Sequence, residues 1–168
     1  VYGRSFNNEN VIDADAYDCK YATIFFNKEG DLWKAHEIKV KYGEKTKLVV
    51  AREIMFKASL EDGLEKLKHF APQKNVFVDC SPTPALSGMY AKAVTVERYE
   101  IDDFDKSVAQ MNLAFSNKSM LVDKKCVSTK VDIESFKFAK SKDENVRYQT
   151  VKDGFVACMR VALKYHGV

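Results

Sequence analysis

Three aspartates stand at places where a hydrophobic segment of the chain begins or ends. Asp15 follows residues 10–14, Asp79 follows residues 75–78, and Asp153 lies at the head of the apolar segment 151–163. A carboxylate beside buried elements needs a partner or a metal ion, because an unpaired charge is costly to bury. Three carboxylates at one end of a sheet would form an oxygen-rich site for Mg²⁺ or Mn²⁺, and paired ions of this kind catalyse phosphodiester hydrolysis.

Two of these aspartates also have a purely local explanation. Asp79 precedes Ser81-Pro-Thr-Pro84, so its carboxylate can equally open a turn by bonding the backbone ahead of it. Asp153 lies three residues after Thr150, which is the spacing of a helix capping box, and an acid in the first turn suits the helix dipole. The capping role is compatible with a metal site, because a carboxylate at a helix start can also face a metal ion.

The first acid is one of two close neighbours. Strand alternation places Asp13 and Asp15 on the same face, opposite Ile12 and Ala14. Asp15 stands at the strand end and is the preferred ligand, with Asp13 as the alternative, while Asp18 would bond the loop backbone or support the ligands. The acids are 64 and 74 residues apart (79 − 15 and 153 − 79), so only the fold can bring them together.

The composition describes one folded domain. The chain has 168 residues, a hydrophobic share of 46% and a net charge of +3 from 27 basic and 24 acidic residues; this charge permits a polyanionic partner without requiring one. The four cysteines and three histidines are scattered, without the paired spacing of zinc sites, which favours a reduced, intracellular environment. No apolar run approaches the roughly 20 residues of a membrane span. Because the first residue is Val rather than Met, we expect a piece of a longer protein.

The first part of the chain alternates in the manner of β-strands. We expect an antiparallel meander with strands at 11–14, 22–26, 35–40 and 47–56. Residues 75–78 form a compact apolar run of the buried type, which we expect to add in parallel beside the first strand.

Helical spacing dominates the rest. We expect a helix from Ser59 to the stop at Pro72, further helices at 86–93, 104–115, 129–139 and 151–165, a stop at Gly167, and short strands near 94–99 and 120–122. The charged residues 140–147 indicate an exposed loop or hairpin. This plan predicts an α/β fold: a mixed central sheet, made of an antiparallel meander plus parallel strands, with helices on both faces.

In this order the three acid motifs resemble the RNase H-like nuclease domain of the large terminase subunit of tailed bacteriophages, over nearly the whole chain. The segment from Ile12-Asp-Ala-Asp15 to Ile24 is similar to that family's first hairpin, and Val76-Phe-Val-Asp79-Cys-Ser-Pro is similar to its middle acid motif. Val151-Lys-Asp153-Gly-Phe is similar to the helix that opens with its last acid. The chain departs from the family at Lys152 and Gly154, where His or Asp is frequent, and has no Gly-x-x-x-x-Gly-Lys phosphate loop.

The resemblance implies a single RNase H-like nuclease domain over residues 1–168, from the C-terminal part of a longer ATPase-nuclease chain. It implies an endonuclease for double-stranded DNA in which Asp15, Asp79 and Asp153 hold two Mg²⁺ or Mn²⁺ ions and Lys152 contacts a phosphate. It further implies viral DNA packaging in the host cell cytoplasm, with an ATPase domain, a small terminase subunit and a portal as partners, and no membrane.

Three other functions stay open from the residues. Another RNase H-like nuclease, such as a junction resolvase, would share the acids and differ in the DNA shape it prefers. A restriction-type nuclease is suggested by Glu37-Ile-Lys39, six residues after Asp31. A non-catalytic DNA-binding or structural domain would carry the acids without cleaving DNA.

Overall fold

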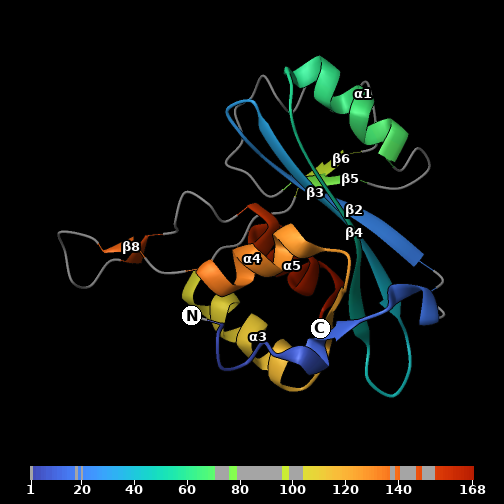
Figure 1. Cartoon of the computed structure of the whole chain (residues 1–168), viewed down its shortest axis with the longest axis vertical. Helices are drawn as coiled ribbons and strands as arrows, with labels where there is room; N and C mark the ends of the chain where they lie inside the picture. The colour runs from blue at the N-terminus through green and yellow to red at the C-terminus, as the bar shows by residue number, and fades with distance from the viewer. Residues whose placement is uncertain are drawn as a thin grey trace.

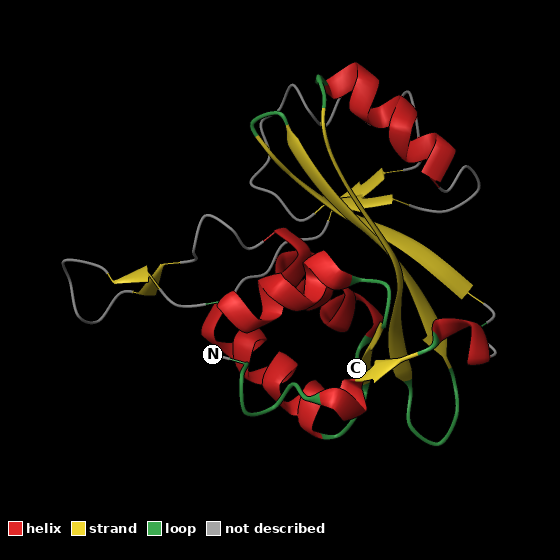
Figure 2. Ribbon diagram, viewed as in Figure 1, coloured by secondary structure: helices red, strands yellow, loops and turns green. Residues whose placement is uncertain are grey.

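The structure, a computed structural model, describes residues 2–17, 19, 21–70, 76–78, 96–98, 104–136, 139–140, 147–148 and 154–168. Four residues of interest, Asp18, Asp79, Lys152 and Asp153, lie outside these ranges, as does the helix expected at 86–93. In the described ranges a mixed sheet runs through the molecule, with helices gathered on both sides of it (Figures 1 and 2).

Three long strands form an antiparallel meander at the centre of this sheet. They are β2 (Tyr21–Glu29), β3 (Leu32–Lys41) and β4 (Lys47–Lys57). The β2–β3 turn contains Gly30 with a φ of +58°, a left-handed conformation that glycine adopts without steric cost. The strands expected at 22–26, 35–40 and 47–56 are therefore confirmed, each inside a longer strand.

Short parallel strands extend the meander at both edges. On one side β5 (Val76–Val78) pairs with β2, and β6 (Val96–Arg98) pairs with β5. On the other side β7 (Met120–Asp123) pairs with β4, and β1 (Val11–Ile12) pairs with β7. The resulting order is β1-β7-β4-β3-β2-β5-β6, which confirms the mixed α/β sheet.

The position expected for the first strand is wrong. We predicted that residues 11–14 would join the meander with residues 75–78 beside them, but β7, β4, β3 and β2 lie between β1 and β5. The strand also ends at Ile12, because Asp13 accepts a hydrogen bond from Asp15 N (3.1 Å) and caps the 3-10 turn η2 (Ala14–Ala16). Such a local bond competes with the strand ladder. In addition, Asp123 at the end of β7 accepts a bond from Ala14 N (2.8 Å) and fixes this turn at that edge.

Helix α1 (Leu60–Phe70) covers one face of the sheet. Its Leu64 and Leu67 pack there against the strand residues Ile24, Phe26, Trp33 and Ala35. Helices α3 (Phe104–Ser116), α4 (Val127–Ser135) and α5 (Gly154–His166) gather on the other face (Figure 1). This confirms the prediction of helices on both faces. None of the helices in the described ranges is long and apolar enough to span a membrane.

Helix α4 ends earlier than expected. We predicted a helix over 129–139, but it runs from Val127 to Ser135 and the chain turns extended at Phe136 (φ −63°, ψ 123°). The reason is packing, since Phe136 is buried and stacks on Tyr2 with ring centroids 5.1 Å apart. The strand β8 (Ala139–Lys140) then pairs antiparallel with β9 (Arg147–Tyr148), so Lys140 and Arg147 are paired as expected for a hairpin.

Helix α5 is the central helix of its layer. All of its residues from Gly154 to Leu163 are buried, as the apolar sequence predicts, and Gly167 ends it with a φ of +65°. Because α5 packs directly on the sheet, its first turn lies close to the strands.

Candidate functional site

The parallel pair β2–β5 ends near the start of α5. Val78, the last residue of β5, pairs with Phe26 of β2, and Asn27 is the next residue of β2. A Cβ added to Gly154, the first residue of α5, would lie 3.4 Å from Asn27 Oδ1. The end of β5 and the start of α5 therefore both lie against the same end of β2.

Two of the three predicted acids are direct sequence neighbours of the residues that meet here. Asp79 follows Val78 in the chain, and Asp153 precedes Gly154. Both acids lie outside the described residues, so their side chains stay a prediction. Their described neighbours Val78 and Gly154 lie at one end of the sheet, which is where open α/β sheets build their ligand sites.

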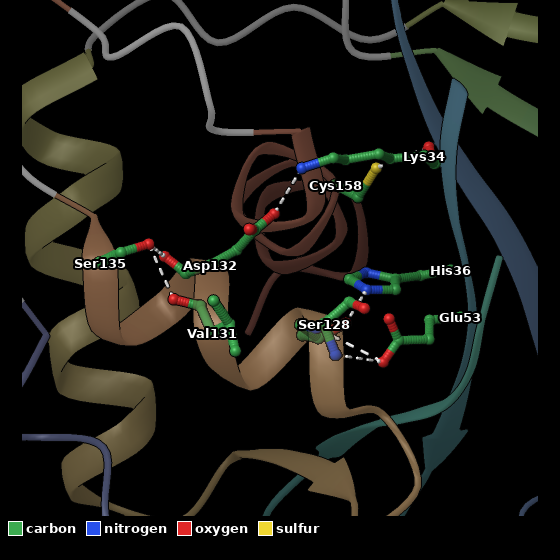
Figure 3. A network of polar contacts seen from close by, with 9 residues as sticks. Lys34, His36, Glu53, Ser128, Val131, Asp132, Ser135 and Cys158 are labelled. Atoms are coloured by element: carbon green, nitrogen blue, oxygen red, sulfur yellow. Dashed lines mark hydrogen bonds and ion pairs between the residues drawn. The ribbon is translucent and has the colours of Figure 1, made fainter. Parts of the chain in front are cut away.

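Lys34 of β3 faces the same end. It is the cross-strand partner of Asn27, and its Cδ would lie 2.7 Å from a Cβ at Gly154. Its Nζ donates to Asp132 Oδ2 of α4 at 2.8 Å, and both side chains are only 13% exposed (Figure 3). The Nζ atom also lies 5.1 Å from the ring centroid of Phe155, within the range of a cation–π contact. A half-buried ion pair therefore lies beside the first turn of α5.

A second polar group lies further along the same face. His36, labelled in Figure 3, is fully buried. Its ring stacks on Phe155 with centroids 4.7 Å apart, and its Nε2 lies 2.7 Å from Thr129 Oγ1. Burial, assisted by the charge of Lys34, lowers the pKa of His36 to about 3, so the imidazole is neutral. Its cross-strand neighbour Glu53 accepts hydrogen bonds from Ser128 N (3.0 Å) and Thr129 N (3.4 Å), and burial raises the pKa of this carboxyl. These contacts fix the start of α4 on the sheet.

The remaining predicted acids lie elsewhere. Asp13 and Asp15 are exposed, at the edge of the sheet formed by β1. The Asp13 carboxylate bonds Asp15 N and lies 3.6 Å from Lys124 Nζ. The structure does not bring these two residues to the end of β2, because four strands separate β1 from β5.

The described donors fit a hard divalent cation better than zinc. The described donor of β2 that lies beside the start of α5 is the amide oxygen of Asn27, and oxygen ligands suit Mg²⁺ and Mn²⁺. Among the residues the structure describes, no three His, Cys, Asp or Glu side chains lie together as a metal site; Asp79 and Asp153 are not among them.

The restriction-type arrangement receives no support from the geometry. Glu37 is buried and its Oε2 lies 2.7 Å from Arg52 Nη2. Strand alternation places Glu37 and Lys39 on the α1 face, opposite Lys34. Asp31 is exposed near the β2–β3 turn.

Sequence reasoning missed the contribution of the β2–β3 hairpin. Asn27 reads as a turn residue, and Asp132 reads as one charge among many on a helix. A usable signal exists in β3, where Lys34 and His36 alternate with Trp33 and Ala35, because polar residues at every second position mark one face of a strand. That face turns out to be covered by α4 and α5.

The fold has clear counterparts among solved structures, although no protein-family model and no curated protein matches the sequence. The large terminase of a thermophilic bacteriophage aligns with a TM-score of 0.80 and 13% identity over 98% of this chain. This chain spans 45% of that terminase's length.

Two isolated domains align over most of both chains. The nuclease domain of the P22 large terminase has a TM-score of 0.75 and 10% identity, and covers 96% of this chain and 90% of its own. The nuclease domain of the bacteriophage SPP1 large terminase, solved with bound Mn, has a TM-score of 0.60 and 13% identity, with 94% and 97% covered. This chain therefore has the RNase H-like fold seen in large-terminase nuclease domains.

Proposed function

We propose that this chain is a metal-dependent endonuclease domain that cuts double-stranded DNA during viral genome packaging. The observation that carries this proposal is the meeting of β2, the end of β5 and the start of α5. Asp79 follows the described end of β5, and Asp153 precedes the described start of α5. The likeness in fold to large-terminase nuclease domains, one of them solved with bound Mn, supports the same function.

In this proposal Asp79 and Asp153 hold Mg²⁺ or Mn²⁺, as two ions, and the Asn27 amide oxygen replaces Asp15 as a third donor. Ions bound there supply an activated water and stabilise charge on the leaving oxygen. The neighbouring Lys152 would contact a DNA phosphate without reading the sequence. The packed hairpin and α5 hold the donors in place, since a site on rigid elements keeps its geometry.

The wider role is also a proposal. Residues 1–168 would form one nuclease domain of a longer ATPase-nuclease chain that works with a small terminase subunit and a portal in the host cytoplasm. This chain spans 45% of the large terminase from the thermophilic bacteriophage, which supports an additional ATPase domain.

One observation favours a second candidate, a DNA-binding or structural domain without cleavage. The residue of β2 that lies beside the start of α5 is the neutral Asn27 rather than a carboxylate. Fewer charged ligands lower the affinity of a site for divalent ions. Under this candidate the domain would bind DNA in the same place and leave it intact.

Plasmid cleavage with Mn²⁺, with and without EDTA, separates the two candidates. We expect Mn²⁺-dependent cleavage that Asp79→Asn abolishes, because Asn keeps the volume and removes the charge that holds the ion. Asp15→Asn is the matched control and should retain cleavage, because Asp15 lies at the other edge of the sheet. Asp79→Asn should melt at or above the wild-type temperature, since losing one of two clustered acids relieves repulsion, and Asp15→Asn should melt near it, because Asp15 is exposed. Full cleavage by a folded Asp79→Asn domain would overturn the proposal.

A further inference from the structure

We propose that Lys34 and Asp132 form a positioning pair for the proposed nuclease site. Asp132 holds the Lys34 ammonium beside the first turn of α5, where this charge meets a phosphate oxygen of bound DNA. The inference rests on the proposed function and adds to it a described residue that contacts the DNA backbone.

The geometry fixes where this charge lies. Lys34 leaves β3 beside Asn27, its stem passes Gly154, and its Nζ reaches Asp132 on α4 at 2.8 Å (Figure 3). Three secondary-structure elements therefore determine the position of one ammonium group. Because an ammonium carries three N–H donors, the bond to Asp132 leaves donors for a phosphate oxygen.

Tethering α4 does not by itself explain a charged pair here. The start of α4 is already attached to the sheet by the bonds from Ser128 N and Thr129 N to Glu53 and by the His36–Thr129 contact. A half-buried ion pair costs desolvation, and apolar residues of similar size usually hold two elements together at least as well. A fixed charge, in contrast, is what a polyanionic ligand requires.

The pair makes two predictions of opposite sign for metal binding. Lys34→Met removes a positive charge near the proposed ions, so Mn²⁺ should bind about three- to tenfold more tightly. Asp132→Asn removes a negative charge, so Mn²⁺ should bind more weakly. Calorimetric titration of Mn²⁺ into the domain without DNA measures both. Lys68→Met is the matched control, because Lys68 pairs with Glu65 on the surface of α1, and it should leave Mn²⁺ affinity unchanged.

DNA binding and cleavage give the second readout. In EDTA, Lys34→Met should weaken duplex binding and reduce the slope of log affinity against log salt by about one. Asp132→Asn keeps the ammonium but weakens the bond that orients it, because an amide oxygen is a weaker acceptor than a carboxylate, so duplex affinity should be retained while kcat falls. Lys34→Gln, which can still donate to Asp132, provides the same comparison if the Met variant does not fold.

The outcomes distinguish a failure of the positioning pair from a failure of the proposed nuclease function. A wild-type domain that neither binds Mn²⁺ nor cleaves DNA overturns both. The positioning pair alone is overturned if the wild-type domain binds Mn²⁺ and cleaves DNA but the Lys34 and Asp132 variants shift Mn²⁺ affinity in the same direction. It is also overturned if these variants change only the melting temperature.

Discussion

His36 shows how a single buried side chain makes the stability of this fold depend on pH. Its imidazole is fully buried between Phe155 and Thr129, and no partner for its Nδ1 atom is found in the described part of the chain. Burial removes the water that would stabilise a charged ring, and the nearby charge of Lys34 adds to this effect, which explains the low pKa of about 3. The ring therefore stays neutral when the protein is folded.

This pKa predicts a loss of stability in acid. Between pH 6.5 and about 3 the unfolded chain binds a proton at His36 that the folded chain does not. The free energy of unfolding should therefore fall with decreasing pH, by up to about 1.4 kcal/mol per pH unit from this group. Burial also lowers the pKa of His166, which acts in the same direction, whereas the raised pKa of Glu53 opposes it just above pH 4.5.

Urea denaturation of wild type and His36→Gln at pH 7, 6 and 5 measures the effect. Gln can still bond Thr129 but does not titrate, so the gap in stability between the two proteins should narrow as the pH falls. Parallel pH profiles would show that His36 takes up a proton in the folded state.

At the scale of elements, helix α1 approaches the sheet closely through one glycine. A Cβ added to Gly63 would overlap the ring of Trp33. That ring cannot move aside, because it is stacked between Phe26 and Phe56 and its Nε1 donates to Ala58 O at 3.0 Å.

Gly63→Ala therefore sets two effects against each other. Alanine favours a helix interior by about 1 kcal/mol over glycine, but overpacking against a rigid ring costs about 1–3 kcal/mol. We expect net destabilisation, measured by thermal or urea unfolding. Gly43→Ala is the control, since a Cβ there meets its nearest atom at 3.9 Å, and it should be nearly neutral. A stabilised Gly63→Ala protein would mean that α1 can shift outward without cost.

The elements also show what a sequence can predict. The meander, α1 and α5 follow from local alternation, helical spacing and turn residues, and each of these acts within a few positions of the chain. The place of β1 follows from pairing with β7 and from the Asp123–Ala14 bond, both of which join residues over 100 positions apart. The Lys34–Asp132 pair and the Asn27 position likewise exist only once the hairpin, α4 and α5 have packed. Composition and spacing contain no direct signal for such contacts.

At the scale of the whole molecule, the segment 2–12 connects the first residues to the last third of the described chain. Within it lies the short 3-10 turn η1 (Asn8–Asn10). Asn10 is fully buried, donates to Phe115 O (2.8 Å) and Met120 O (3.2 Å), and accepts from Asn7 N (3.0 Å). Tyr2 packs edge-on against Phe115 at 5.6 Å. One amide side chain thus joins this segment to α3 and β7.

Asn10→Ala should destabilise the molecule far from any proposed site. The change removes two buried hydrogen bonds, and each such bond contributes about 0.5–1.5 kcal/mol to stability. Asn8→Ala, at an exposed position of the same turn, should change the free energy of unfolding little. Equal unfolding midpoints for the two variants would indicate that segment 2–12 is not part of the cooperative unit.

The pairing of β1 with β7 also sets an order of events during synthesis. Asn10 leaves the ribosome before its partners Phe115 and Met120, which are made 105 and 110 residues later. At about 5–20 residues per second, residues 2–12 wait for roughly 5–20 s without their partners. The meander can close during this time, because its contacts are local in sequence. Residues 2–12 are therefore made before their partners and are among the last parts of this domain to dock, and synthesis that stalls before β7 leaves Tyr2 and Phe6 open to chaperones and proteases.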